Sequence, residues 1–295
     1  MDKQRVATIY GFAVALIWGM SFLSIKVAVN VVPPMTMAVL RFVIACAVLP
    51  LVALFAKQSL KVALRDLPVL AAGGFMGVTL YFLGENHGVA LLTASESSLI
   101  IGSIPVLTVL SEEIFLKTRV GGRVHLGAFI SFLGVSLIVA PSLGSQVHRL
   151  GYLFMAVAAL SWVVYSFLTK GVGSRYGKIT VIFWQCLFGL LGCVPFALRE
   201  AHAWQMPGTV VVLNLVYLGV ICSAAGYWLY ASALDHLGAG RTSVFVNLIP
   251  VVSVVGSFFL LGERLGAFQL VGGTIAVLGV FLATVTPGSR VKALC

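Results

Sequence analysis

Apolar runs recur along the whole chain and are separated by short segments that carry charges, prolines or glycines. Crossing the ~30 Å hydrocarbon core of a bilayer takes roughly 20 residues of α-helix, and the runs are close to that length. The pattern predicts an all-α membrane protein with ten transmembrane helices, over residues 6–29, 34–55, 67–91, 95–116, 124–140, 151–169, 180–197, 209–234, 242–261 and 267–286. The connections are too short to hold a further domain.

Composition supports lipid as the solvent. Sixty per cent of the residues are hydrophobic and only 9% are charged, whereas a soluble domain carries roughly 25% charged residues. The formal charge of +10 does not indicate nucleic-acid binding, because the positive residues lie between the apolar runs and form no basic stripe. We expect the lipid bilayer as a partner and no nucleic acid.

The distribution of lysine and arginine predicts the orientation in the membrane. Cytoplasmic loops are enriched in these residues. Of the 19, 14 fall on one side of the predicted topology, 4 fall on the other, and Arg41 lies inside the second helix. Both termini are on the richer side, so we expect both to be cytoplasmic.

The chain contains an internal repeat. A shift of 145 residues aligns residues 97–141 with residues 242–286 without a gap, and 14 of the 45 positions are identical, including Pro105 with Pro250. Trp18 and Trp162 match at a shift of 144. The repeat predicts two five-helix units, residues 1–145 and 146–295. Because five is odd, the second unit is inverted, which is an architecture of alternating-access carriers.

The same residues carry a family resemblance over essentially the whole chain. The sequence resembles the EamA repeat of the drug/metabolite transporter superfamily at Trp18-Gly19, Lys26, Pro33-Pro34, Arg41, Pro250, Gly262-Glu263-Arg264-Leu265 and Gln269-Leu270. Within it, the chain is similar to YddG-type exporters of the bacterial inner membrane, which implies export of aromatic and other neutral amino acids. The first repeat departs from the family's Gly-Glu-Arg run at residues 116–119. A role for that glutamate therefore applies only to Glu263, beside Arg264.

Four aromatic residues are candidates for contact with a solute. Trp18 and Trp162 each lie about 17 Å into their helices, at 1.5 Å per residue, and so close to the midplane of the bilayer. Tyr81 and Tyr165 are also deep in their spans, and their rings suit an amphipathic solute. These four residues either line a cavity or fill the core between the helices.

Ionisable residues inside the membrane are few, because placing a charged side chain at the bilayer centre costs at least ~2.5 kcal/mol. Glu85 and His87 lie in the outer third of the third span, at a depth similar to that of Arg41, and Glu96 begins the fourth. A structural pair of Arg41 with Glu85 or Glu96 is one interpretation. The other is that Glu85 or His87 binds a substrate ammonium or a coupling proton.

Further polar and proline residues occur in the fourth and ninth spans. Ser98, Ser243 and Asn247 either satisfy a neighbouring helix or line a cavity. Pro105 and Pro250 lie near mid-span, where a proline removes one backbone donor and leaves a carbonyl unpaired. Their recurrence in both repeats favours a hinge or gate over a simple packing kink.

Other classes of function lack their sequence signals. The chain has no HExxH, GxSxG or GxxxxGK[ST] motif, so we expect no enzyme, and we expect no metal or cofactor. A channel usually needs a polar pore lining. A nucleotide-sugar carrier needs buried cations for phosphate, and cationic drugs are a further alternative. We predict a monomeric exporter of small organic solutes, with neutral and aromatic amino acids as its substrates.

Overall fold

A computed structural model of the chain describes residues 3–117, 121–142, 145–173 and 175–284. Within these ranges the chain is helical and contains no strand. The first half forms α1 (Lys3–Val29), α2 (Pro34–Phe55), η1 (Leu64–Asp66), α3 (Leu67–Gly74), η2 (Phe75–Leu80), α4 (Tyr81–Leu91), α5 (Ala94–Ile101), α6 (Ile104–Leu116), α7 (Gly122–Val139) and η3 (Ala140–Ser142). The second half forms α8 (Gln146–Gly173), α9 (Lys178–Arg199), η4 (Ala201–Ala203), α10 (Thr209–Val216), η5 (Tyr217–Ala225), α11 (Gly226–Val246), α12 (Ile249–Leu260) and α13 (Ala267–Thr284).

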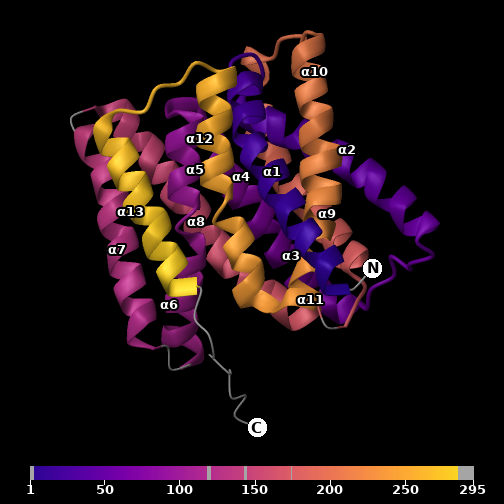
Figure 1. The fold of residues 1–295 in the computed structure, drawn as a ribbon. Coiled ribbons are helices and arrows are strands. Elements are labelled where there is room, and N and C mark those ends of the chain that lie inside the picture. The colour runs from indigo at the N-terminus through magenta and orange to yellow at the C-terminus, as the bar shows by residue number, and fades with distance from the viewer. Residues whose placement is uncertain (1–2, 118–120, 143–144, 174, 285–295) are drawn as a thin grey trace.

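These elements make up the ten predicted spans. Seven helical stretches of the described residues are long and apolar enough to cross a membrane, and shorter apolar helices cover residues 122–138, 249–260 and 267–283. The loop predicted over residues 235–241 differs from the structure, because α11 is helical across it. In Figure 1 the chain descends along α10 and rises along α12, so its direction reverses within α11.

Two spans contain a π-helical segment that the sequence did not predict. In the third span, η2 separates α3 from α4, and in the eighth span, η5 separates α10 from α11. Both segments end at equivalent positions of the repeat, one residue before Tyr81 and one residue before Gly226. Wide turns of this kind often occur at functional sites.

The fourth and ninth spans are each broken in the middle. The break between α5 and α6 falls at Gly102 and Ser103, and the break between α11 and α12 falls at the equivalent Asn247 and Leu248. Pro105 is the second residue of α6, and Pro250 holds the same position in α12. An N–H in the first turn of a helix has no partner in the helix, so proline is favourable there. The prolines thus begin a new helix, and each span is interrupted just before its proline rather than kinked as one continuous helix.

The two halves are inverted relative to each other. Helices α7 and α13 occupy equivalent places in the repeat and pack side by side (Figure 1). Gly127 of α7 faces the backbone of Gly279, whereas Gly134, further along α7, faces the backbone of the earlier residue Gly272. Residue numbers therefore rise along one helix as they fall along the other. The two equivalent helices are antiparallel, as an inverted repeat requires.

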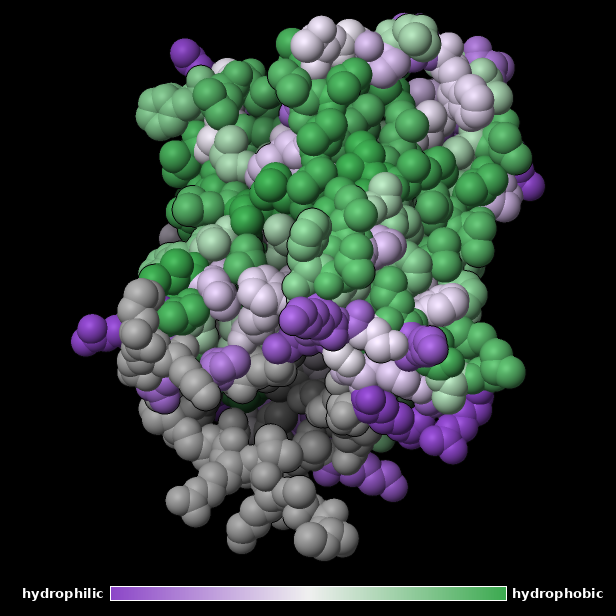
Figure 2. All heavy atoms as spheres, turned by 90° about the vertical axis from the view of Figure 1, so that its right-hand side faces the viewer, coloured by the Kyte–Doolittle hydropathy of each residue, from purple (hydrophilic) through white to green (hydrophobic). Residues whose placement is uncertain are grey.

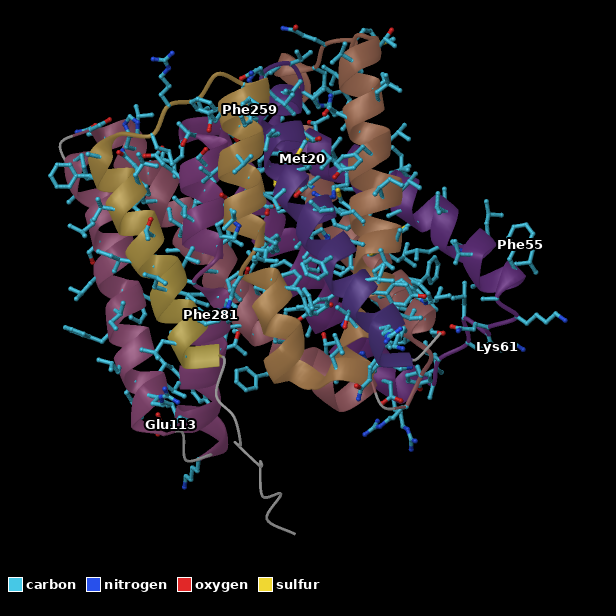
Figure 3. All side chains as sticks on the ribbon, viewed as in Figure 1. Met20, Phe55, Lys61, Glu113, Phe259 and Phe281 are labelled. Carbon is cyan, nitrogen blue, oxygen red and sulfur yellow. The ribbon has the colours of Figure 1, made fainter. Side chains whose placement is uncertain are left out.

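The outside of the molecule is an apolar belt. Figure 2 shows hydrophobic side chains over the middle and upper parts of one face and hydrophilic side chains gathered toward its lower end. Phe55, Phe259 and Phe281 point outward in Figure 3, and each is at least 49% exposed, while Lys61 and Glu113 lie in the lower part of that view. A large continuous apolar surface is stable against lipid rather than water. The chain is a multi-pass membrane protein.

Candidate functional site

A cavity of about 70 Å³ lies between the two halves. Five pairs of residues at equivalent or nearly equivalent positions of the repeat line it: Trp18 and Trp162, Phe82 and Tyr227, Glu85 and Tyr230, Ile101 and Val246, and Ile104 and Ile249. The first pair is 144 residues apart and the other four are 145 residues apart. The cavity therefore lies on the axis that relates the two halves.

Aromatic rings form much of its wall. The ring of Trp18 meets Trp162 edge to face, with centroids 6.2 Å apart, and its centroid is 5.7 Å from that of Tyr227. Trp162 stacks on Tyr227 at 6.1 Å and lies 5.0 Å from Tyr81. Offset and edge-to-face contacts of this kind are the favourable ones for aromatic pairs. The wall of the cavity is therefore largely aromatic.

Glycines in the π-helical spans make room for these rings. The indole Nε1–H of Trp18 donates to the carbonyl of Cys222 in η5 at 3.1 Å, and a Cβ atom at Gly226 would collide with the same indole. In the other half, a Cβ atom at Gly77 of η2 would collide with the ring of Tyr165. The first helix of each half thus places an aromatic ring against the π-helical span of the other half.

One arginine and one glutamate line the cavity. Arg41 of α2 is 4% exposed, and its Nε–H donates to the hydroxyl of Ser223 at 2.7 Å. Its guanidinium lies over the ring of Phe82, 4.4 Å from the centroid. Glu85 of α4 is 3% exposed and accepts a hydrogen bond from the hydroxyl of Tyr81 at 2.8 Å. Within the described ranges neither side chain forms an ion pair.

The other two carboxylates that we considered lie away from the cavity. Glu96 begins α5, where it forms a capping box with Thr93 and accepts from the hydroxyl of Tyr152 at 3.1 Å. Glu263, in the loop before α13, accepts hydrogen bonds from Ala94 N–H at 2.9 Å and from the Ser95 hydroxyl at 2.8 Å. Both therefore hold the start of α5, and the structure shows no pair of Glu96 with the cavity arginine.

Other predicted residues lie behind the wall or elsewhere. Tyr165 packs against Trp162 with centroids 5.0 Å apart and donates to Gln185 at 3.2 Å, so it supports the cavity wall from behind. Ser98 is fully buried and donates to a backbone carbonyl of its own helix. His87 stacks on Phe154. Arg264 is exposed.

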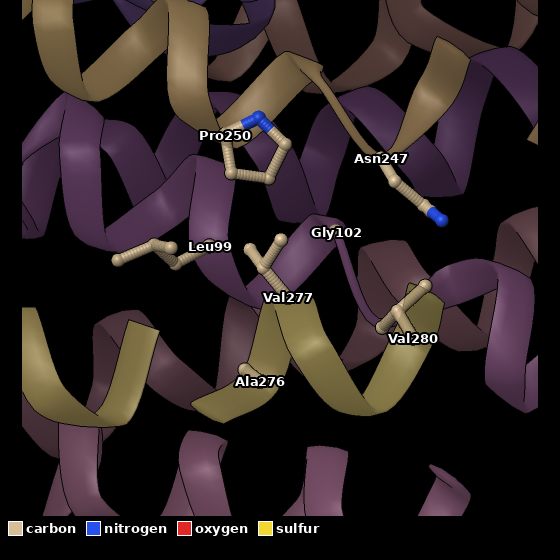
Figure 4. A pocket seen from close by; sticks show the side chains of 7 residues that line it. All are labelled: Leu99, Gly102, Asn247, Pro250, Ala276, Val277 and Val280. Atoms are coloured by element: carbon tan, nitrogen blue, oxygen red, sulfur yellow. The ribbon is translucent and has the colours of Figure 1, made fainter. Parts of the chain in front are cut away.

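Asn247 and Pro250 line a second, smaller cavity of about 10 Å³, between the two helix breaks and α13 (Figure 4). Gly102 and Leu99 form its other side. Its volume is close to that of one water position.

Pro105 is partly buried. The side chain of Ser243, together with Thr118 and Arg119, lies outside the described part of the structure.

Tyr227 and Tyr230 were not predicted. Within spans that are apolar on all sides, no periodicity marks which face meets the cavity. The repeat carried a usable signal, because a shift of 145 residues pairs Tyr227 with Phe82 and Tyr230 with Glu85. Tyr230 could have been assigned to the cavity as the equivalent of Glu85, whereas Phe82, the equivalent of Tyr227, was not predicted either.

The model of the EamA-like transporter family matches residues 5–140 and 149–285 of the chain. The chain belongs to the EamA-like transporter family. It is thus a membrane transporter, and membership of this family implies a small-molecule substrate.

EamA relatives and a solved structure agree with this. The chain is 28% identical over 266 residues to an uncharacterized transporter of Archaeoglobus fulgidus, covering 90% of this chain and 94% of the relative. It is 28% identical over 218 residues to a probable terminal-alkyne amino-acid exporter of Streptantibioticus cattleyicolor, covering 74% and 73%. It is 25% identical over 295 residues to a probable amino-acid metabolite efflux pump of Escherichia coli, covering 95% of each. A crystal structure with 22% identity matches with a TM-score of 0.68, covering 95% of this chain and 98% of that one, so the two chains share a fold.

Proposed function

We propose that this EamA transporter exports neutral and aromatic amino acids across the bacterial inner membrane by alternating access. The observation that carries the proposal is the aromatic cavity on the axis between the two halves. A site on that axis contacts equivalent elements of both halves, so exchanging their conformations exposes it to the opposite side. Residues 1–145 and 146–295 are the two exchanging units in this proposal.

The chemistry of the wall supports the substrate class. Trp18, Trp162, Tyr81 and Tyr227 provide apolar faces with polar edges, which suit an apolar or aromatic side chain. The names of two relatives, an amino-acid exporter and an amino-acid metabolite efflux pump, point to the same class. The cavity of about 70 Å³ is below the roughly 300 Å³ at which pockets for drug-sized ligands begin. A drug-sized ligand would therefore need a wider cavity than this conformation offers.

The helix breaks supply the moving part of the mechanism. The fourth and ninth spans are interrupted at Gly102 and Asn247, beside the cavity residues Ile101 and Val246. A chain bends more easily where helical hydrogen bonds are interrupted. We assign Pro105 and Pro250 as the fixed first turns of the half-helices that swing about these points.

The test is counterflow in proteoliposomes made with the purified protein. Vesicles loaded with L-phenylalanine, L-leucine, a cationic dye or UDP-glucose are challenged with the same labelled compound, with and without a pH gradient. We expect saturable exchange of the two amino acids, and protein-free vesicles serve as the control. Exchange of only the dye or only UDP-glucose would refute the substrate class. A steady current or non-saturable flux would indicate a channel instead of a carrier.

A further inference from the structure

We propose that Arg41 and Glu85 together bind the two charged groups of one zwitterionic substrate, with Arg41 on its carboxylate and Glu85 on its ammonium. This inference rests on the proposed function and narrows it. The substrate class becomes free α-amino acids in which both groups are unmodified. Amines, carboxylic acids and N-acylated amino acids would be poor substrates.

Arg41 has unused hydrogen-bond donors at the cavity. Only its Nε–H is bonded, to Ser223, and its two terminal nitrogens have no hydrogen-bond acceptor in the described ranges. The side chain is nevertheless 4% exposed. The planar guanidinium presents paired N–H groups that match the two oxygens of a carboxylate. The contact with the Phe82 ring holds the guanidinium without neutralising its charge.

Glu85 offers the complementary group. One carboxylate oxygen accepts the hydrogen bond from Tyr81, and the other has no donor among the described residues. Tyr81 lies one helical turn before Glu85 on α4 and so fixes the direction of the carboxylate along the cavity wall. A carboxylate with a free oxygen is a suitable partner for a substrate ammonium.

The two charges are only partly compensated within the protein. An ionised group deep in the membrane is costly unless it is paired. Arg41 and Glu85 attract each other electrostatically across the cavity, but neither forms a direct ion pair within the described part. An amino acid carries its ammonium and its carboxylate on one carbon and would compensate both groups at once. A molecule with only one of the two groups would leave the other side chain unpaired.

The asymmetry of the cavity indicates how the substrate lies. The repeat pairs Glu85 with Tyr230 and Arg41 with Cys186, so neither charge has a charged equivalent in the second half. Both charged groups are therefore on α2 and α4, whereas the second half contributes Trp162 and two tyrosines. The backbone of the amino acid would face α2 and α4, and its side chain would face α8 and α11.

The experiment measures inhibition of L-phenylalanine counterflow by compounds that share its ring. Unlabelled L-phenylalanine is compared with phenethylamine, which lacks the carboxylate, with 3-phenylpropionate, which lacks the ammonium, and with N-acetyl-L-phenylalanine. One charge-assisted hydrogen bond corresponds to about a tenfold change in affinity or more. We expect each of the three analogues to inhibit at least about tenfold more weakly than L-phenylalanine.

Two variants test which side chain binds which charged group of the substrate. Arg41→Gln should weaken inhibition by L-phenylalanine and by 3-phenylpropionate but should not weaken inhibition by phenethylamine. Glu85→Gln should weaken inhibition by L-phenylalanine and by phenethylamine but should not weaken inhibition by 3-phenylpropionate. The matched controls are Arg123→Gln and Glu113→Gln, which remove the same charges outside the cavity and should behave as the wild type.

The outcomes separate this inference from the proposed function. If the wild type exchanges L-phenylalanine but all analogues inhibit equally well, the zwitterion site is refuted and the exporter stands. If no amino acid is exchanged, the proposed function itself fails. The comparison of analogues uses only the wild-type protein. It therefore tests the inference even if Arg41→Gln or Glu85→Gln does not fold.

Discussion

The indole rings of Trp18 and Trp162 meet edge to face with their centroids 6.2 Å apart. The two residues occupy nearly equivalent positions of the two repeats, so the axis between the halves passes close to this contact. Both rings also contact Tyr227. The contact joins the halves at the cavity and at the same time forms part of its wall.

Replacing either indole should therefore weaken binding of aromatic substrates. We expect Trp18→Ala and Trp162→Ala to raise the KM for L-phenylalanine by roughly three- to tenfold, the value of one aromatic contact of about 0.5–1.5 kcal/mol. The KM for L-alanine should change less, because its methyl group reaches fewer rings. The measurement is counterflow at a series of substrate concentrations.

Trp204→Ala is the matched control. This indole is 50% exposed and donates to the hydroxyl of Thr36, away from the cavity. We expect wild-type KM values for both amino acids. An equal loss for L-phenylalanine and L-alanine in the Trp18 variant would mean that the ring serves packing and not substrate contact.

The sequence could predict the depth of side chains in the membrane better than their direction. Trp18, Trp162 and Tyr81 were chosen by their depth along predicted helices and Glu85 as an ionisable residue within a span, and all four line the cavity. Tyr165 was chosen by the same criterion and lies behind Trp162. Depth follows from the rise per residue, whereas direction depends on how neighbouring helices pack. In spans that are apolar all round, the pattern contains no information on that packing.

The same limit applies to the fold. The ten spans were predictable because every backbone polar group in lipid must be bonded within a helix, which requires apolar runs of sufficient length. The π-helical segments η2 and η5 were not, because an apolar run has the same composition in either kind of helix. The prolines marked the broken spans, but their position in a first turn became clear only with the breaks at Gly102 and Asn247.

The antiparallel packing of α7 and α13 should be sensitive to a single methyl group. A Cβ atom at Gly134 would collide with the backbone of Gly272 and Ala276. Backbone atoms cannot rotate away as a side chain can, and overpacking typically costs about 1–3 kcal/mol. We expect Gly134→Ala to lower the melting temperature in detergent, measured by scanning fluorimetry. Gly121→Ala is the control, because no atom lies within 4 Å of its added methyl group. Equal melting temperatures would contradict the close contact.

Glu263 should stabilise the start of α5 through its charge. Its carboxylate accepts hydrogen bonds from the N–H of Ala94 and from the hydroxyl of Ser95, at the positive end of the helix dipole. We expect Glu263→Gln to cost about 1 kcal/mol, which for a chain of this size corresponds to a fall of roughly 2–4 °C in melting temperature. Arg264→Gln changes the exposed neighbouring residue and should leave the melting temperature unchanged. A Glu263→Gln protein as stable as the wild type would show that the loop does not hold α5.

The orientation in the membrane is testable with two glycines that have open space around them. Gly122 begins α7, next to a loop of the lysine- and arginine-rich side, and Gly208 precedes α10 on the opposite side. Because positive loops remain in the cytoplasm, a membrane-impermeant maleimide should label Gly208→Cys in intact cells and Gly122→Cys only after permeabilisation. The native cysteines are first replaced by alanine, and the parent without cysteine is the control. Labelling of both positions from outside would contradict the antiparallel arrangement of the halves, since an inverted repeat places these two loops on opposite faces of the bilayer. Labelling of Gly122→Cys alone would reverse the orientation of the whole protein, and the termini would then lie outside the cytoplasm.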